Sequence, residues 1–236
     1  TKKSYSKWKK LGIFSRKIFS KIYLALPQNK ETGIYLKNLG LKKIKYLGNL
    51  KFSSIDKNIF PKKYQNRIKK FDNRIIFCAA STHEGEDEIF IRLHKEIKKK
   101  INKLLTIIIP RHIKRTEKII ELIKNYNLTY ELHTENNKNK NDIYVVDAYG
   151  ESEKFYSLSK TVFMGGSLIK HGGQNPLEPA RLGSRVINGP YISNFKEVYS
   201  LLNKLKISTT VRSNKELKKY MLTYLKKSKK NKNYFK

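Results

Sequence analysis

Short apolar runs alternate with helix-length amphipathic segments through the second half of the chain. The expected strands cover residues 75–79, 104–109, 143–146, 161–164 and 185–188, with helices between them near 85–101, 116–126, 152–159 and 176–182. Runs such as 104–109 are apolar at nearly every position, which is typical of strands covered by helices on both faces. The pattern predicts an α/β fold with a Rossmann-like, doubly wound parallel sheet, which binds ligands at the carboxyl ends of its strands.

The first fifty residues follow a different pattern. Apolar side chains at positions 5, 8, 11, 14 and 18 recur at helical spacing among lysines, which predicts a basic amphipathic helix, although Gly12 lies inside it. Short buried strands are expected at 22–26 and 43–47, joined by a helix that Asn29 caps and Gly40 ends. We expect residues 1–52 to be the end of one domain, 53–73 a linker, 74–212 the Rossmann-like domain, and 213–236 a last helix, capped by Ser213, with a basic tail.

The charge is large and unevenly distributed. The 236 residues include 52 Lys and Arg against 19 Asp and Glu, a formal net charge of +33. Residues 1–70 carry +18, residues 71–211 only +6, and residues 212–236 carry +9. Such a balance suggests nucleic-acid binding, but a genome rich in A and T would also favour lysine, and the central domain is the least basic region. A single cysteine excludes a disulfide framework, and no apolar run approaches the length of a membrane span.

The richest motif begins where the strand at 161–164 ends. Paired glycines at 165–166 and 172–173 precede Asn175-Pro176-Leu177-Glu178, which opens a helix. Glycines let backbone N–H groups approach an anion, and a helix start adds partial positive charge. Glu178 would lie in the first turn, placed to accept hydrogen bonds from sugar hydroxyls. The alternative is two tight turns with a favourably placed N-terminal acid.

Six ordered blocks resemble the Kdo transferases, the 3-deoxy-D-manno-octulosonic-acid transferases of lipopolysaccharide synthesis. The blocks are Gly48-Asn49-Leu50-Lys51-Phe52, Ala80-Ser81-Thr82-His83-Glu84-Gly85-Glu86, Ile109-Pro110-Arg111-His112, Asp147-Ala148-Tyr149-Gly150-Glu151, the run from Gly165 to Glu178, and Gly189-Pro190 with Asn194-Phe195. Together they extend over nearly the whole chain.

The resemblance implies the C-terminal half of a glycosyltransferase B (GT-B) fold, with residues 1–52 ending an N-terminal acceptor domain. It implies inverting transfer of Kdo from CMP-Kdo to the lipid A precursor (lipid IVA), without a metal or other cofactor. It places the enzyme at the cytoplasmic face of the bacterial inner membrane, where basic segments would meet an anionic surface. The expected partners are therefore CMP-Kdo, the lipid A precursor and that membrane surface, and no nucleic acid is expected.

The family's functional positions map onto four blocks. By resemblance, the CMP-binding residues are Pro110, Arg111, Tyr149, Gly150, Glu151, Asn175, Pro176, Leu177 and Glu178. Lys51 matches a lysine assigned to transition-state stabilisation. Tyr149 stands where Met is common in the family, and Gln174 where His is usual. Arg111 would also suit a phosphate on physical grounds, because its guanidinium donates two parallel hydrogen bonds.

Other polar residues have simpler interpretations. The acids at 84–88 are explained by the helix that starts there, with Ser81 or Thr82 as its cap, and do not form a metal-binding pattern. Cys78 is expected in the core. His83 could lie near the sugar, and His112 and His171 could line the cleft.

The family's general base, a glutamate in a Ser-x-Gly-Glu motif, has no counterpart here. Most of the acceptor domain and any membrane anchor in it would be missing, so we expect the chain to bind CMP or CMP-Kdo weakly without transferring sugar. Alternatives are a GT-B enzyme that uses a UDP-sugar, a basic nucleic-acid-binding protein, and a nucleotide-binding module that has lost catalysis.

Overall fold

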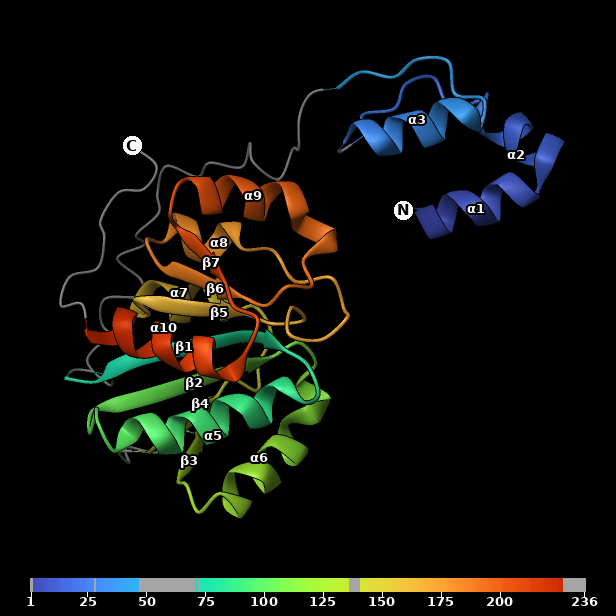
Figure 1. Cartoon of the computed structure of the whole chain (residues 1–236). Coiled ribbons are helices and arrows are strands. Elements are labelled where there is room, and N and C mark those ends of the chain that lie inside the picture. Colours follow the sequence, from blue (N-terminus) through green and yellow to red (C-terminus); the bar gives the residue numbers. More distant parts are fainter. Residues whose placement is uncertain (1, 28, 47–70, 72, 136–140, 227–236) are drawn as a thin grey trace. The chain divides into compact units, whose positions relative to one another are not determined.

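The computed structural model describes residues 2–27, 29–46, 71, 73–135 and 141–226 (Figure 1). Lys51 and nearly all of the expected linker 53–73 lie outside these residues. The chain divides into two compact units, Thr1–Asn58 and Ile59–Lys236.

The larger unit is built on a seven-stranded parallel sheet with the order β3-β4-β2-β1-β5-β6-β7. The strands are β1 (Ile75–Thr82), β2 (Leu104–Pro110), β3 (Tyr130–Leu132), β4 (Ile143–Val145), β5 (Thr161–Met164), β6 (Arg185–Asn188) and β7 (Ser208–Thr210). The five expected strands are confirmed. The edge strands β3 and β7 were not predicted, because each has three residues and neither is a continuous apolar run.

Helices connect the strands. They are α5 (Glu86–Lys98), α6 (Thr116–Asn125), α7 (Ser152–Leu158), α8 (Leu177–Arg181), α9 (Lys196–Lys204) and α10 (Asn214–Lys226), with short 3-10 turns η4 (Ile113–Arg115) and η5 (Ser193–Phe195). The sequence pattern missed α9. The expected cap of the last helix is confirmed, since the N–H of Glu216 donates to Oγ of Ser213 at 3.2 Å.

Both faces of the sheet are covered, as the apolar runs indicate. On one face, α5 and α10 pack over Phe77, Ala79, Phe163 and Ile187, and α5 and α6 extend this layer over β2 and β4 (Figure 1). On the other, Phe155 of α7 lies against Tyr144 of β4, with ring centroids 5.6 Å apart. Cys78 is fully buried in β1, as expected, and burial raises the pKa of its thiol.

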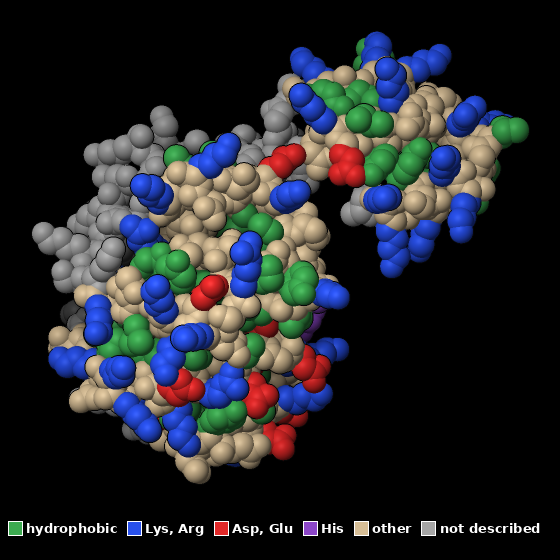
Figure 2. All heavy atoms as spheres, viewed as in Figure 1, with side chains coloured by type: hydrophobic (Ala, Val, Ile, Leu, Met, Phe, Trp, Pro, Cys, Tyr) green, Lys and Arg blue, Asp and Glu red, His purple; other side chains and the backbone are tan. Residues whose placement is uncertain are grey.

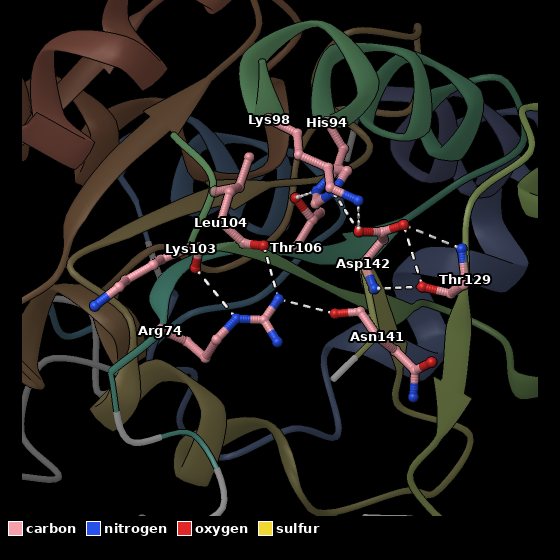
Figure 3. Close-up of polar contacts among 9 residues, drawn as sticks. All are labelled: Arg74, His94, Lys98, Lys103, Leu104, Thr106, Thr129, Asn141 and Asp142. Atoms are coloured by element: carbon pink, nitrogen blue, oxygen red, sulfur yellow. Dashed lines mark hydrogen bonds and ion pairs between the residues drawn. The ribbon is translucent and has the colours of Figure 1, made fainter. Parts of the chain in front are cut away.

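A polar network connects the elements at the edge of the sheet where the strands begin (Figure 3). Asp142, just before β4, contacts Lys98 of α5, and one carboxylate oxygen accepts from the backbone and side chain of Thr129 at 3.2 and 3.1 Å. Nε2 of the buried His94 lies 3.7 Å from the other oxygen, while its Nδ1 meets Oγ1 of Thr106 at 2.9 Å. The network ties α5 to β2 and to the β3–β4 connection at the edge opposite the strand ends that would bind a ligand.

The smaller unit contains α1 (Lys2–Lys10), α2 (Gly12–Phe19) and α3 (Lys30–Asn38). The single helix expected over positions 5–18 is broken at Gly12, whose φ of +50° suits glycine and interrupts the helix. The Asn29 cap is confirmed by a 2.8 Å hydrogen bond from the N–H of Thr32, and Gly40 ends the segment with a φ of +101°.

The two buried strands expected in this unit are wrong. Residues 22–26 and 43–46 are joined by one parallel bridge, Ala25 with Ile44, and neither segment forms a strand. Ile22, Leu24 and Leu26 are each more than 40% exposed, because no element in the described part of this unit covers them. Residue 47 of the second expected strand lies outside the described residues. No helix in the described parts of the chain is both long enough and apolar enough to span a membrane.

Candidate functional site

The expected ligand-binding loops lie at one edge of the sheet. They follow β4, β2, β1 and β5, which are consecutive neighbours and all parallel, so their carboxyl ends meet along that edge. Three strand spacings separate β4 from β5, about 14 Å at the usual distance between strands. The edge is therefore long enough for a ligand the size of a nucleotide.

The glycine loop after β5 is organised by Glu86, the first residue of α5. Its fully buried carboxylate accepts hydrogen bonds from the N–H groups of Gly166 (2.7 Å), Ser167 (3.1 Å), Leu168 (3.0 Å) and His83 (3.0 Å). Burial raises the pKa of Glu86, and these four hydrogen bonds oppose the rise. The loop's backbone donors, which the sequence suggested for an external anion, are thus occupied by a carboxylate of the protein itself.

The glycines in this loop are required by close backbone contacts. A Cβ on Gly165 would lie 2.2 Å from the carbonyl oxygen of Ser81, and one on Gly189 would lie 2.1 Å from that of Ser167. Ser81 has a φ of +53° and lies at the point where the register between β1 and β2 shifts. The ends of β1, β5 and β6 therefore fit together only with glycine at these positions.

Contacts within the protein also hold the second glycine pair and the first N–H group of α8. The N–H of Gly173 donates to the carbonyl of Gly166 at 2.8 Å, and the side chain of Asn194 occupies the space where a Cβ on Gly172 would lie. Oδ1 of Asn175 accepts from the N–H of Leu177 at 3.2 Å. Because α8 has only five residues and its first N–H is already bonded, the expected anion site at its start is not confirmed.

The pair Pro110 and Arg111 ends β2 and begins its loop. Pro110 is buried as the last residue of the strand, and Arg111 is exposed. The N–H of Arg111 donates to the carbonyl of Thr82 at 3.0 Å, which fixes the backbone while leaving the guanidinium in solvent. Arg111 can therefore meet an anion at this edge.

The segment Tyr149, Gly150 and Glu151 forms the turn from β4 into α7. Tyr149 is exposed, and Gly150 has a φ of +82° in open space. Glu151 lies 3.6 Å from both Nε2 of His133 and Nζ of Lys154. Its carboxylate therefore pairs with the ammonium group of Lys154 and lies beside the ring of His133, at the start of α7.

Pro176 and Leu177 are buried and support Glu178, whose carboxylate faces solvent in the first turn of α8. Partial burial and then the charge of Glu153 raise the pKa of Glu178, while Arg181 opposes the rise. Glu153 belongs to α7, so the loops after β4 and β5 approach one another here. A solvent-facing carboxylate in this place can accept hydrogen bonds from hydroxyl groups.

The acidic run at 84–88 has more structure than the sequence indicated. Ser81 and Thr82 belong to β1 and do not cap α5; Gly85, with a φ of +87°, occupies the cap position instead. The buried Asp87 pairs with Arg115, which also donates to the carbonyl of Thr82 at 3.1 Å. Among the described residues, no three His, Cys, Asp or Glu side chains are grouped so as to hold a metal ion.

An open groove of about 530 Å³ lies where β5 and β6 end. Its lining residues are Lys170, His171, Gly172, Pro190, Tyr191, Ile192, Ser193 and Lys196. Its two lysines, Lys170 and Lys196, make this groove basic. Sequence reasoning singled out the motifs on its two sides but did not predict that they enclose one space.

Comparison with known proteins agrees with this architecture. Residues 1–54 match the family model described as 3-deoxy-D-manno-octulosonic-acid transferase (kdotransferase). A bifunctional glycosyltransferase/methyltransferase of Fusobacterium nucleatum is 34% identical over 94% of this chain and 35% of its own length. The 3-deoxy-D-manno-octulosonic acid transferase of Haemophilus influenzae is 32% identical over 85% of this chain and 48% of its own length. The chain thus spans between about a third and a half of these relatives.

A crystal structure of the C-terminal CMP-Kdo binding domain of WaaA from Acinetobacter baumannii superposes with a TM-score of 0.65 at 26% identity. The match covers 70% of this chain and 88% of that domain. The expected fold class, a Rossmann-like C-terminal half of a GT-B fold, is confirmed. The chain belongs to the 3-deoxy-D-manno-octulosonic-acid transferase family.

Proposed function

We propose that this chain supplies the donor-binding half of a Kdo transferase and binds CMP-Kdo at the carboxyl edge of its sheet. The observation that carries the proposal is the placement of three matched segments, 110–111, 149–151 and 175–178, in loops of that one edge. The similarity to a CMP-Kdo binding domain supports the same donor.

In this proposal Arg111 binds the phosphate of the donor, because it is exposed at the strand end and its donors form a fork. Glu178 accepts hydrogen bonds from hydroxyl groups of the donor. Lys51, outside the described residues, would stabilise charge on the departing nucleotide. The acceptor would be the lipid A precursor (lipid IVA), the transfer would be inverting, and neither metal nor cofactor would take part.

Calorimetric titration of the 236-residue chain with CMP and with UDP tests the donor. We expect CMP to bind more tightly, and tighter binding of UDP would favour a GT-B enzyme that uses a UDP-sugar. Arg111→Ala should weaken CMP binding about tenfold or more, because a hydrogen bond to a charged group contributes about 1.5–3 kcal/mol. Lys114→Ala, at an exposed position three residues further on, is the matched control and should change the affinity less than twofold.

Transfer itself is tested with CMP-Kdo and lipid IVA. We expect no turnover by the 236-residue chain alone, because its sequence has no counterpart of the family's catalytic glutamate. Robust turnover would show that another residue acts as the base.

The site of action follows from the acceptor. We propose a peripheral position at the cytoplasmic face of the inner membrane, where the basic residues 1–70 would meet anionic lipid. Stronger binding to vesicles with anionic lipid than to neutral vesicles is the expected result. Equal binding to both would leave compositional bias as the better account of the charge.

A further inference from the structure

Three histidines gather at the carboxyl ends of β1, β2 and β5. The rings of His83 and His171 are tilted by 32°, with centroids 4.1 Å apart, and the rings of His83 and His112 meet edge to face at 6.3 Å. They come from three separate loops, so the strand order and not local sequence brings them together. No functional position carried over from the family resemblance includes any of them.

His83, at the centre of the cluster, has a buried polar atom that the protein does not satisfy. The residue is 8% exposed, and its Nε2 has no hydrogen-bond partner among the described residues. Nε2 would lie 3.3 Å from a Cβ on Gly166, so glycine at that position keeps space beside the nitrogen. A buried polar group without a hydrogen-bond partner destabilises the protein, which makes Nε2 a candidate contact for a ligand.

The surroundings of His83 are positive. Burial, followed by the charges of His171, Arg115, His112 and Arg111, lowers its pKa to about 4, so the ring is neutral near pH 7. A bound anion would favour the protonated ring and raise that pKa.

Neither nearby carboxylate supplies that anion. Glu86 is held by backbone N–H groups, including that of His83 itself, and Asp87 is paired with Arg115. Both acids beside the cluster therefore already have partners, and neither occupies Nε2 of His83.

We propose that His83, flanked by His112 and His171, receives an anionic oxygen of the donor substrate through Nε2. The anion is either the phosphate of the nucleotide or the carboxylate of the sugar acid. This inference rests on the proposed donor site, and it adds a contact beyond Arg111 and the loop residues named above. His171 also lines the basic groove, so the cluster connects the end of β2 with that groove.

The test compares CMP, cytidine and free Kdo as ligands of the full 236-residue chain by calorimetry. His83→Phe removes the donor but keeps a ring beside His171, and His83→Gln restores an N–H near the position of Nε2. If the phosphate is the anion, His83→Phe should weaken CMP binding about tenfold or more without affecting cytidine, and His83→Gln should recover most of it. If the carboxylate is the anion, His83→Phe should weaken the binding of free Kdo by the same factor.

The matched control is His94→Phe, which replaces a buried histidine at the opposite edge of the sheet (Figure 3). It should lower the melting temperature while leaving ligand affinities unchanged. Melting curves of both His83 variants establish that they are folded. Affinities for CMP and Kdo that equal those of the wild type in folded His83→Phe would overturn the inference.

A titration followed by NMR separates this inference from the proposed function. The pKa of His83 should rise from about 4 when CMP, Kdo or inorganic phosphate saturates the protein. Failure of the wild type to bind CMP would contradict the proposed function, and inorganic phosphate would then still test the cluster. If none of the three anions moves the pKa of His83, the inference is wrong.

Discussion

The two units of the molecule cover their apolar side chains to very different degrees. Of the fourteen large hydrophobic side chains exposed among the described residues, ten lie between residues 11 and 46. In the larger unit, by contrast, Phe77, Phe90 and Phe163 are fully buried between the sheet and its helices. Parallel strands are normally covered on both faces. The larger unit meets this condition, whereas the described part of the smaller unit has a single parallel bridge and leaves its apolar side chains exposed.

The units also differ in charge. The described residues 2–46 contain thirteen Lys and Arg and one acid, Glu31, whereas residues 71–211 carry acids and bases in comparable numbers. Figure 2 shows the same contrast, with Lys and Arg dominating the smaller unit and both signs mixed over the larger one. Most of the net charge of +33 therefore lies toward the ends of the chain and not in the region of the candidate site.

Matched phenylalanine substitutions should show the difference in burial between the two units with the largest effect. Phe163→Ala should lower the free energy of unfolding by about 3–5 kcal/mol, because it opens a cavity beside Phe90 in a closed core. Phe14→Ala should change it by less than about 0.5 kcal/mol, because that side chain is 62% exposed. Urea unfolding followed by circular dichroism measures both, and equal effects would contradict the contrast.

Glu86 tests whether the loop after β5 depends on a buried carboxylate. Glu86→Gln should cost about 2–3 kcal/mol, because an amide cannot accept all four N–H groups and turns its own donors toward some of them. Glu84→Gln, two residues earlier and 81% exposed at its side chain, should cost less than about 0.5 kcal/mol. Thermal or urea unfolding measures the stability of both variants. If Glu86→Gln is as stable as the wild type, the loop after β5 does not need the carboxylate charge.

Acid stability should depend on Asp142. Burial alone would raise the pKa of Asp142, but interactions with His94, Lys98 and Thr129 outweigh it and hold the pKa well below the usual value of 3.8. The carboxylate therefore stabilises the fold above about pH 4, and this contribution is lost as the pH falls further. Asp142→Asn should unfold with a weaker pH dependence below pH 4 than the wild type. If Asp142→Asn has the same pH dependence of stability below pH 4 as the wild type, other groups are responsible for acid unfolding.

Removal of residues 1–58 should have the smallest effect. Because the core of the larger unit is closed by its own helices, its free energy of unfolding should change by less than about 0.5 kcal/mol. Cooperative urea unfolding of the 59–236 chain measures this. A large loss of stability would show that the smaller unit supports the sheet.

Sequence reasoning succeeded where a local pattern carries the structure. The apolar runs at 75–79, 104–109, 143–146, 161–164 and 185–188 predicted five strands, and side-chain caps at Asn29 and Ser213 were visible as residue types. It failed for β3 and β7, whose three-residue edge strands carry no such run. It also failed at residues 22–26, because burial of an apolar run depends on neighbours that the run itself does not specify.

The sequence predicted which segments form the candidate site, but not the side-chain contacts that connect them. The strand-end glycines and the segments at 110–111, 149–151 and 175–178 lie in loops at one edge, as expected. The roles of Glu86, Arg115 and Asn194 were missed, since each acts on a distant part of the chain. Glu86, directly before Asp87 and Glu88, gave only the signal of acids at a helix start, and nothing in the local sequence marks it as buried.

The hydrogen bond from Gly166 to Glu86 joins residues 80 positions apart, which has a consequence for the order of folding. Such a contact forms only after the entropy of closing a long loop has been offset by other interactions. During synthesis, α5 emerges well before its partners at 166–168 exist, and those partners directly follow β5, which pairs with β1. The shape of the donor loop should therefore be among the last features acquired, and hydrogen exchange at Gly166 would report completion of the whole sheet.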